Sequence, residues 1–292
     1  MQFHNTTLAT STRGGIRSAA AIGLLAVGSL GALVPTAAAA PGVISPAATS
    51  IVTRSTSGAV ELQAGTATTN DVQVFLESGI LTITDTAGLT AGTGCTLVNS
   101  LEVQCGTGVT NVGLFLGDQD DVVRVQTGIA TTVFGEAGND FFHGGLVAGA
   151  DSQAFYDGGT GADTVSYASA DRFVVVTVST SLTGNDGRPD DVDNVQASIE
   201  TVIGTRFPDT LTGDGLANIL TGGDGADTIT GNKGADTLDG GKGADVLTGG
   251  AGVDLLKAED SAKDTTIDCS SGKDTAAVDA GLDVAVNCET LN

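Results

Sequence analysis

The chain has 292 residues, with 12 basic and 35 acidic side chains and a net charge of −23. A surface this acidic repels nucleic acid and anionic membranes and attracts cations. We therefore expect no nucleic-acid partner. With only two histidines and no tryptophan, little scope remains for histidine-based catalysis or for binding sugars on large aromatic rings.

The first residues, 1–39, have the pattern of a secretory signal peptide. Arg13 and Arg17 form a positively charged start, an apolar run follows over 19–34, and small residues precede a cleavage point after Ala39. A transmembrane anchor is the alternative, but a span takes about twenty apolar residues and this run is shorter. We therefore expect an extracellular protein without a membrane span.

Residues 40–60 are expected to form a mobile leader, and residues 61–116 an N-terminal β region. In the β region, short apolar runs such as VQVFLES and ILTITDT are separated by Gly and Asn turns. Regular short strands of this kind indicate either a small β domain or degenerate coils of a longer solenoid.

The four cysteines allow three pairings. We expect the local one, Cys95–Cys105 with Cys269–Cys288, because Cys95 and Cys105 bracket a segment with the pattern of a hairpin. Each bridge would contribute on the order of 3 kcal/mol by restricting the unfolded chain. No Cys-x-x-Cys or Cys/His spacing indicates zinc.

Residues 117–203 are expected to form a degenerate repeat and β region. The segments GEAGNDFFH and GGTGADTVS place Asp140 and Asp163 two residues before an apolar residue, and Asp121 stands in the same relation to Val123. A longer excursion follows Asp163 and contains the polar turn GNDGRPDDVDN, whose acidic residues are expected in a loop.

From residue 204 to residue 257 the chain repeats every nine residues, six times in succession. The clearest copies are GGDGADTIT, GNKGADTLD, GGKGADVLT and GGAGVDLLK. The sixth position holds Asp209, Asn218, Asp227, Asp236, Asp245 and Asp254. The eighth position holds Leu211, Leu220, Ile229, Leu238, Leu247 and Leu256. A flexible glycine-rich linker has no reason to keep these aliphatic residues in phase.

One apolar residue in nine predicts a short strand with a single inward side chain, joined to the next strand by a glycine turn. If each repeat is half a coil, Asp209, Asp227 and Asp245 stack along one edge. Asn218, Asp236 and Asp254 then stack along the other edge. Stacked carboxylates repel one another unless a cation lies between them, and calcium binds carboxylate and carbonyl oxygens.

These repeats resemble the RTX nonapeptide repeats of secreted calcium-binding proteins. The resemblance implies an all-β fold, a right-handed parallel β-roll or β-helix solenoid, with Ca²⁺ bound by the first six positions. The expected metal ligands are Asp227, Asp236, Asp245, Asp254, Asp209, Asn218, Asp163 and Asp140. Carbonyl ligands are expected from Gly222, Gly225, Gly231, Gly234, Gly240, Gly243, Gly249 and Gly252. Asn218 in place of Asp and Phe207 in place of Gly predict weaker turns.

Residues 258–292 are expected to cap the solenoid, because the spacing slips to ten residues (Asp254, Asp264, Asp274) and the Cys269–Cys288 bridge closes the last coils. The ending resembles the terminal segment of calcium-binding repeat proteins exported by actinobacteria.

The leading hypothesis is therefore a secreted, non-enzymatic protein that folds into a β-roll on binding calcium. Two alternatives remain open: a surface or matrix interaction protein that calcium stiffens, and a polysaccharide-active β-helix enzyme. The second is disfavoured because only Tyr156 and Tyr167 could add to a sugar platform, and the single histidine after the signal, His143, is expected to face solvent.

Overall fold

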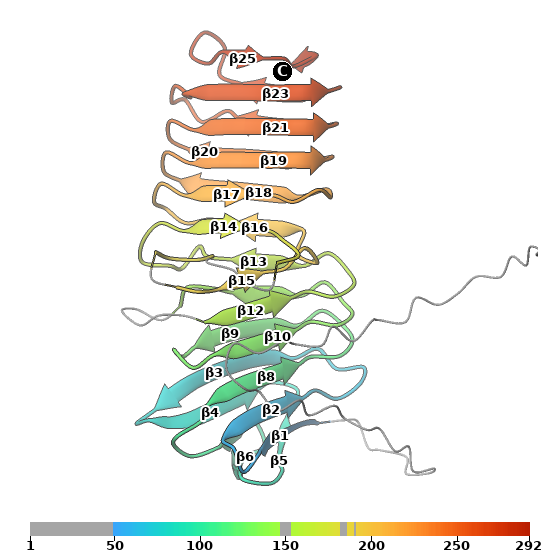
Figure 1. The fold of residues 1–292 in the computed structure, drawn as a ribbon, viewed down its shortest axis with the longest axis vertical. Coiled ribbons are helices and arrows are strands. Elements are labelled where there is room, and N and C mark those ends of the chain that lie inside the picture. Colours follow the sequence, from blue (N-terminus) through green and yellow to red (C-terminus); the bar gives the residue numbers. More distant parts are fainter. Residues whose placement is uncertain (1–48, 147–152, 182–185, 190) are drawn as a thin grey trace, which may run out of the picture. The chain divides into compact units, whose positions relative to one another are not determined.

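The computed structural model describes residues 49–146, 153–181, 186–189 and 191–292, which all belong to one compact unit. The signal peptide predicted for residues 1–39 lies outside these residues. Within the described part, no helix is long and apolar enough to cross a membrane. The unit is built from β-strands that stack coil upon coil (Figure 1).

One face of the stack is a single sheet of thirteen strands. From the C-terminal end its order is β26 (Thr290–Leu291), β24 (Thr275–Val278), β22 (Leu255–Ala258), β20 (Thr237–Lys242), β18 (Ile219–Asp224), β16 (Thr201–Ile203), β13 (Thr164–Ser166), β11 (Phe141–His143), β9 (Val122–Gln126), β3 (Asp71–Glu77), β4 (Ile80–Asp85), β7 (Glu102–Gln104) and β6 (Thr96–Asn99).

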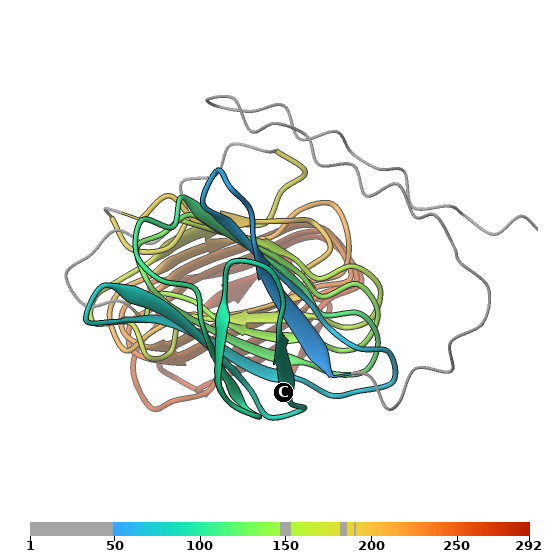
Figure 2. The same cartoon turned by 90° about the horizontal axis from the view of Figure 1, so that it is seen from below.

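The opposite face is divided between two sheets, of seven and six strands. The first runs β15 (Asn194–Val195), β12 (Ala154–Asp157), β10 (Thr131–Phe134), β8 (Asn111–Phe115), β2 (Ala59–Gln63), β1 (Ser50–Arg54) and β5 (Leu89–Ala91). The second runs β14 (Val175–Thr177), β17 (Thr210–Thr212), β19 (Thr228–Gly234), β21 (Val246–Gly252), β23 (Thr266–Gly272) and β25 (Ala285–Val286). From β8 to β14, and again from β15 to β26, successive strands alternate between the two faces, and the view along the stack shows the coils wound in this way (Figure 2).

The repeat region forms parallel coils of eighteen residues, as the sequence predicts. Ile219 in β18 lies opposite Thr237 in β20, and Thr228 in β19 lies opposite Val246 in β21. The register then lengthens to twenty residues, where Val246 lies opposite Thr266. This is the slip in spacing seen after residue 257, and the parallel stacking continues through it.

The core is a thin double row of aliphatic side chains between the two faces. All six eighth-position residues are fully buried: Leu211, Leu220, Ile229, Leu238, Leu247 and Leu256. Leu211, Ile229 and Leu247 stack in successive strands of one face, while Leu220, Leu238 and Leu256 stack in the other. Burying each such side chain contributes about 1.5–3 kcal/mol, so the predicted apolar period is confirmed as the source of the core.

The N-terminal region belongs to the same solenoid. Strand β2 pairs in parallel with β8, and β3 with β9, so both faces continue into it. The prediction of a mobile leader through residue 60 is wrong for its described part, because β1 lies in the sheet with Val52 fully buried. Antiparallel pairs β1–β2, β3–β4 and β6–β7 close this end of the stack.

Both disulfides have the local pairing expected from the sequence. Cys95–Cys105 brackets the antiparallel hairpin of β6 and β7. Cys269–Cys288 joins β23 to the segment between β25 and β26, at the C-terminal end of the stack. A covalent link therefore ties the chain at each end of the solenoid.

Candidate metal centre

In five of the six repeats the first glycine lies where two oxygen atoms converge: Gly204, Gly213, Gly222, Gly231 and Gly249. A Cβ atom on Gly204 would lie 2.6 Å from Asp209 Oδ2 and 2.5 Å from the carbonyl oxygen of Gly222. On Gly222 it would meet Asp227 Oδ2 and the carbonyl oxygen of Gly240 in the same way. Any side chain at these positions would displace these oxygen atoms. Glycine therefore allows the aspartate carboxylate to approach the carbonyl oxygen of the next coil.

The second and fourth glycines allow successive turns to stack closely. Gly241 has a φ of +87°, and a Cβ on it would overlap the carbonyl oxygen of Gly223, one coil earlier. Gly243 stands in the same relation to the carbonyl oxygen of Gly225. Each edge of the solenoid therefore carries a column of stacked turns rich in carbonyl oxygens, the ligand type that calcium shares with carboxylates.

The sixth-position aspartates form hydrogen-bonded ladders along both edges. Asp227 Oδ1 accepts the backbone N–H of Asp209 at 2.7 Å, and Asp245 Oδ1 accepts that of Asp227 at 2.8 Å. On the other edge, Asp236 Oδ1 accepts from Asn218 at 2.8 Å, and Asp254 Oδ1 from Asp236 at 2.9 Å. The two predicted columns are therefore present, and one oxygen of each carboxylate holds the coil before it in register.

The ladders extend beyond the clear repeats. Asp121 N–H donates to Asp140 Oδ1 at 2.9 Å, and Asp140 N–H donates to Asp163 Oδ1 at 2.8 Å. At the other end, Asp264 Oδ1 accepts from Asp245 and Asp274 Oδ1 from Asp254, both at 2.8 Å. Asp121, Asp264 and Asp274 are absent from the predicted ligand set, although the ten-residue spacing after Asp254 was a signal for the last two.

In most of these residues the second carboxylate oxygen is buried without a hydrogen-bond partner. Among the described residues this holds for Oδ2 of Asp121, Asp140, Asp163, Asp227, Asp236, Asp254, Asp264 and Asp274. An unsatisfied buried polar group costs about 1–3 kcal/mol, and more when it is charged. A row of such oxygens facing glycine turns requires either protons or cations.

The pKa values of these carboxyls reflect the same environment. Burial raises the pKa of Asp227 to about 7; the N–H of Asp209 lowers it in part, and the nearby carboxylates of Asp209 and Asp245 raise it further. Burial likewise raises the pKa of Asp236 and of Asp140 to about 6. A bound divalent cation reverses this effect, because it stabilises the ionised form.

The two irregular copies satisfy their sixth residue from within the turn. Asp209 Oδ2 accepts the backbone N–H of Thr205 at 2.5 Å, and Asn218 Oδ1 accepts that of Asp214 at 2.9 Å. Neither residue is therefore left with the unpaired oxygen that characterises Asp227, Asp236 and Asp254. In these two copies, where the glycine pattern is lost, the side chain of the sixth residue has no buried oxygen atom without a hydrogen-bond partner.

The donor set is that of an oxygen-ligated cation. In the described part of the chain, no three or more His, Cys, Asp or Glu side chains gather in one place. Each turn instead offers one carboxylate among several carbonyl groups. Such a set fits calcium, which takes about six to eight oxygen ligands, better than zinc, which takes Cys and His.

The other residues singled out from the sequence have structural positions. His143 is half-buried on β11 with its ring 4.8 Å from that of Phe141, and burial lowers its pKa. Tyr156 and Tyr167 are fully buried in the core and form no exposed platform. Asp186 and Asp193, which were expected in a loop, are both buried and accept backbone N–H groups of neighbouring segments.

Comparison with protein-family models identifies these turns. The model of the RTX calcium-binding nonapeptide repeat matches residues 131–150, 197–228 and 221–256, in four copies. The chain carries RTX-type nonapeptide repeats. RTX nonapeptide repeats bind calcium ions, so this RTX chain is a calcium-binding protein, as its sequence predicts. The search of curated proteins gave no match.

The match to the RTX family model extends beyond residues 204–257, where the sequence repeat is clearest. It includes residues 131–150, which hold Asp140, as well as most of 204–257. The turns that end at Asp163, Asp264 and Asp274 lie outside the matched residues, yet they belong to the same ladders.

Proposed function

We propose that this RTX protein is exported, and that calcium bound at its turns drives the folding of the solenoid. The row of buried Oδ2 atoms without partners is the observation that carries the proposal. Without a cation, these carboxylates are desolvated and close to one another, and both effects oppose folding. With calcium they become ligands, so that the free energy of binding contributes to the free energy of folding.

The strongest calcium positions are assigned to turns with the full glycine pattern. Their carboxylates belong to Asp227, Asp236, Asp245 and Asp254, and their carbonyls to Gly222, Gly225, Gly231, Gly234, Gly240, Gly243, Gly249 and Gly252. Asp140 and Asp163 are assigned as further positions. Asp209 and Asn218 are assigned weaker positions, because their oxygens already accept N–H groups of their own turns.

Each aspartate has two tasks in this scheme. Its Oδ1 holds the preceding coil in register through a backbone N–H, and its Oδ2 supplies negative charge to the space between turns. Calcium supplies the positive charge that lets the carboxylates of adjacent coils approach. The glycines supply the room, since a side chain at the first position would displace Oδ2.

Export would separate the unfolded and folded states in space. Extracellular calcium modules bind with dissociation constants of about 0.1–1 mM, so the chain would stay unfolded where calcium is scarce and fold outside. The signal-peptide pattern of residues 1–39 supports this. Mass spectrometry of the protein from the culture medium is expected to find a chain that begins at Ala40, and an uncleaved cell-bound chain would contradict export.

Titration calorimetry and far-UV circular dichroism test the coupling together. Calcium is expected to bind with release or uptake of heat and to convert a weakly structured spectrum into a β-rich one. Asp236→Asn keeps the Oδ1 acceptor but removes the charge, so it should lose one calcium equivalent. Asp224→Asn is the matched control, because Asp224 is exposed and pairs with Lys242. Identical β-rich spectra in calcium and in chelator would refute the coupling.

A further inference from the structure

The turn formed by residues 269–274 has the geometry of a calcium-binding turn, although the family model does not match it. In the pairing of β21 with β23, Gly250 lies opposite Ser270 and Gly252 opposite Gly272. Ser270 adopts a positive φ of 69°, as Gly250 does at 111°. A Cβ on Gly272 would overlap the carbonyl oxygen of Gly252, so the close stacking of fourth positions is also kept.

The carbonyl oxygen of Cys269 takes the place that a glycine carbonyl has in the other turns. At the position of a Cβ on Gly249, the nearest atoms are Asp254 Oδ2 at 2.7 Å and Cys269 O at 2.9 Å. One coil earlier, a Cβ on Gly231 would meet Asp236 Oδ2 and the carbonyl oxygen of Gly249. The backbone of a disulfide-bonded cysteine therefore belongs to the oxygen set around Asp254.

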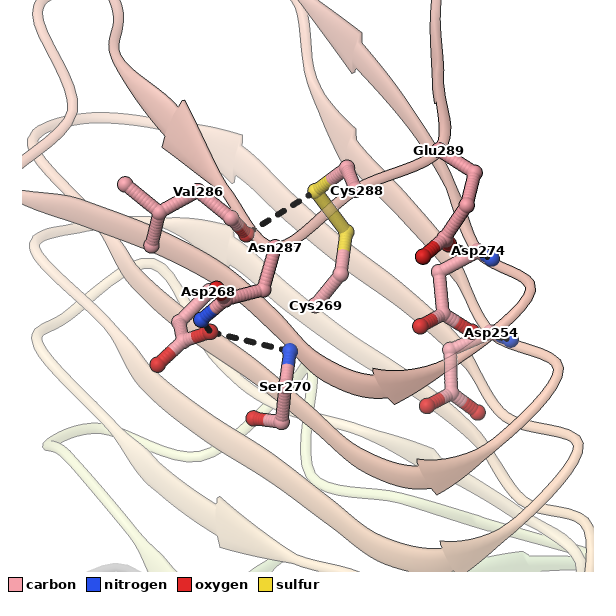
Figure 3. Close-up of a disulfide and its surroundings, with 9 residues drawn as sticks. All are labelled: Asp254, Asp268, Cys269, Ser270, Asp274, Val286, Asn287, Cys288 and Glu289. Carbon is pink, nitrogen blue, oxygen red and sulfur yellow. Dashed lines mark hydrogen bonds between the residues drawn. A yellow bond between two sulfur atoms is a disulfide. The ribbon is translucent and has the colours of Figure 1, made fainter.

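Asp274 adds a buried carboxylate with one free oxygen. The residue is fully buried, and its Oδ1 accepts the N–H of Asp254 at 2.8 Å. Its Oδ2 has no hydrogen-bond partner, which distinguishes it from an acidic residue that merely lies in a cluster. Asp254, Asp274 and Glu289 lie one above another beside the disulfide (Figure 3).

The disulfide restrains both sides of this oxygen set. Cys269 is one end of the bond. Cys288, the other end, precedes Glu289, whose Oε2 accepts the N–H of Asp274 at 2.7 Å. Strands β25 and β26 each pair with the coil before at only two positions, so the disulfide adds a covalent link where the strand pairing is short. Opening the bond would remove the covalent restraint on the segment that carries Glu289.

We propose that turns 249–254 and 269–274 hold a calcium ion between them, at a site whose integrity depends on the Cys269–Cys288 disulfide. The proposal rests on the proposed calcium-binding function, and it extends the column of sites to turn 269–274, which the family model does not match. The Cys269 carbonyl and the carboxylates of Asp254 and Asp274 supply its oxygens. Reduction of the disulfide lowers the affinity of this site and leaves the sites of Asp227 and Asp245 intact.

Calcium titration of the unmodified full-length chain and of four variants tests the site. Asp274→Asn, which keeps the disulfide, should bind one calcium ion fewer than the unmodified chain. Cys269→Ser with Cys288→Ser should lose the same single ion, and the combination of all three changes should lose no more than that one. Cys95→Ser with Cys105→Ser is the matched control, expected to keep every ion.

Unchanged stoichiometry and affinity in both Asp274→Asn and the Cys269/Cys288 variant would overturn the site while leaving the proposed function standing. Absence of calcium binding in the unmodified chain would instead refute the proposed function and the site with it. Far-UV circular dichroism in calcium confirms that each variant is folded, and Asp274→Asn serves as the test if the cysteine variant is not.

The coupling between calcium binding and disulfide reduction gives a second test. The fraction of each disulfide that is reduced is measured at equilibrium in a buffer of reduced and oxidised dithiothreitol. The dithiol gives two electrons and two protons to the disulfide, yielding two protein thiols and its own cyclic disulfide. Since coupling is reciprocal, saturating calcium should disfavour reduction of Cys269–Cys288 by about fivefold or more at equilibrium. Alkylation and mass spectrometry report each bond separately. An equal shift at Cys95–Cys105, or no shift at Cys269–Cys288, would overturn the dependence.

Discussion

Replacing Gly243 with alanine is expected to destabilise the calcium-loaded fold by about 2–6 kcal/mol. A Cβ at this position would overlap the carbonyl oxygen of Gly225, far inside the 3.0 Å below which real Cβ contacts essentially never occur. The obstacle is backbone, so it cannot rotate away, and overpacking of this kind costs about 1–3 kcal/mol. The φ of +144° adds about 1–3 kcal/mol for a residue with a side chain.

Urea unfolding in saturating calcium, followed by far-UV circular dichroism, measures this loss. Gly215→Ala is the control within the same repeat region, because a Cβ on Gly215 meets no atom within 4 Å and its φ is not positive. That variant should match the unmodified chain or gain about 0.4–1 kcal/mol from a less flexible unfolded state. If the free energies of unfolding of the two variants differ by less than about 1 kcal/mol, the stacked-turn explanation for the glycines is refuted.

Five further outcomes are expected. Leu238→Ala, which empties a fully buried core position, should lower the free energy of unfolding by about 2–5 kcal/mol. Val253→Ala, at a side chain that is 62% exposed, should change it by less than about 0.5 kcal/mol in the same urea assay. Asp209→Asn should reduce calcium binding less than Asp236→Asn in calorimetry, since Asp209 Oδ2 already has a partner; equal losses would contradict this ranking. Calcium affinity should fall as the pH drops from 8 through 7 and 6, because protons compete for carboxyls such as Asp227 and Asp236, whose pKa values are raised to about 7 and about 6. The calcium-free fold should show the opposite trend: its raised pKa values mean that it binds more protons than the unfolded chain, so its stability is greatest in acid and is lost as the pH rises through them. A calcium-free circular dichroism signal independent of pH between 5 and 8 would contradict that sign.

The repeat region was predictable because each coil contacts only its neighbours. A period of nine with two alternating columns places Asp227 beside Asp245 without knowledge of any distant segment. The same logic extended to Asp140 and Asp163, whose turns keep the spacing of aspartate and apolar residue. It did not extend to the leader, because β1 pairs with β5 across about forty residues that carry no period.

The sequence by itself determined the coil length, the inward row of aliphatic residues, the two aspartate columns and the local disulfide pairing. The first three follow from spacing along the chain, since a fixed period sets which residues stack, and the disulfide pairing was chosen from three because Cys95 and Cys105 bracket a hairpin pattern. Only the tertiary structure decided which hydrogen bonds, if any, each of the two carboxylate oxygens accepts. Whether Oδ2 is left for a cation, as in Asp236, or taken by a backbone N–H, as in Asp209, depends on the path of the turn around it. That path is set by contacts between coils, and the same contacts bring Cys269 and Asp274 into a column that the nine-residue period no longer marks.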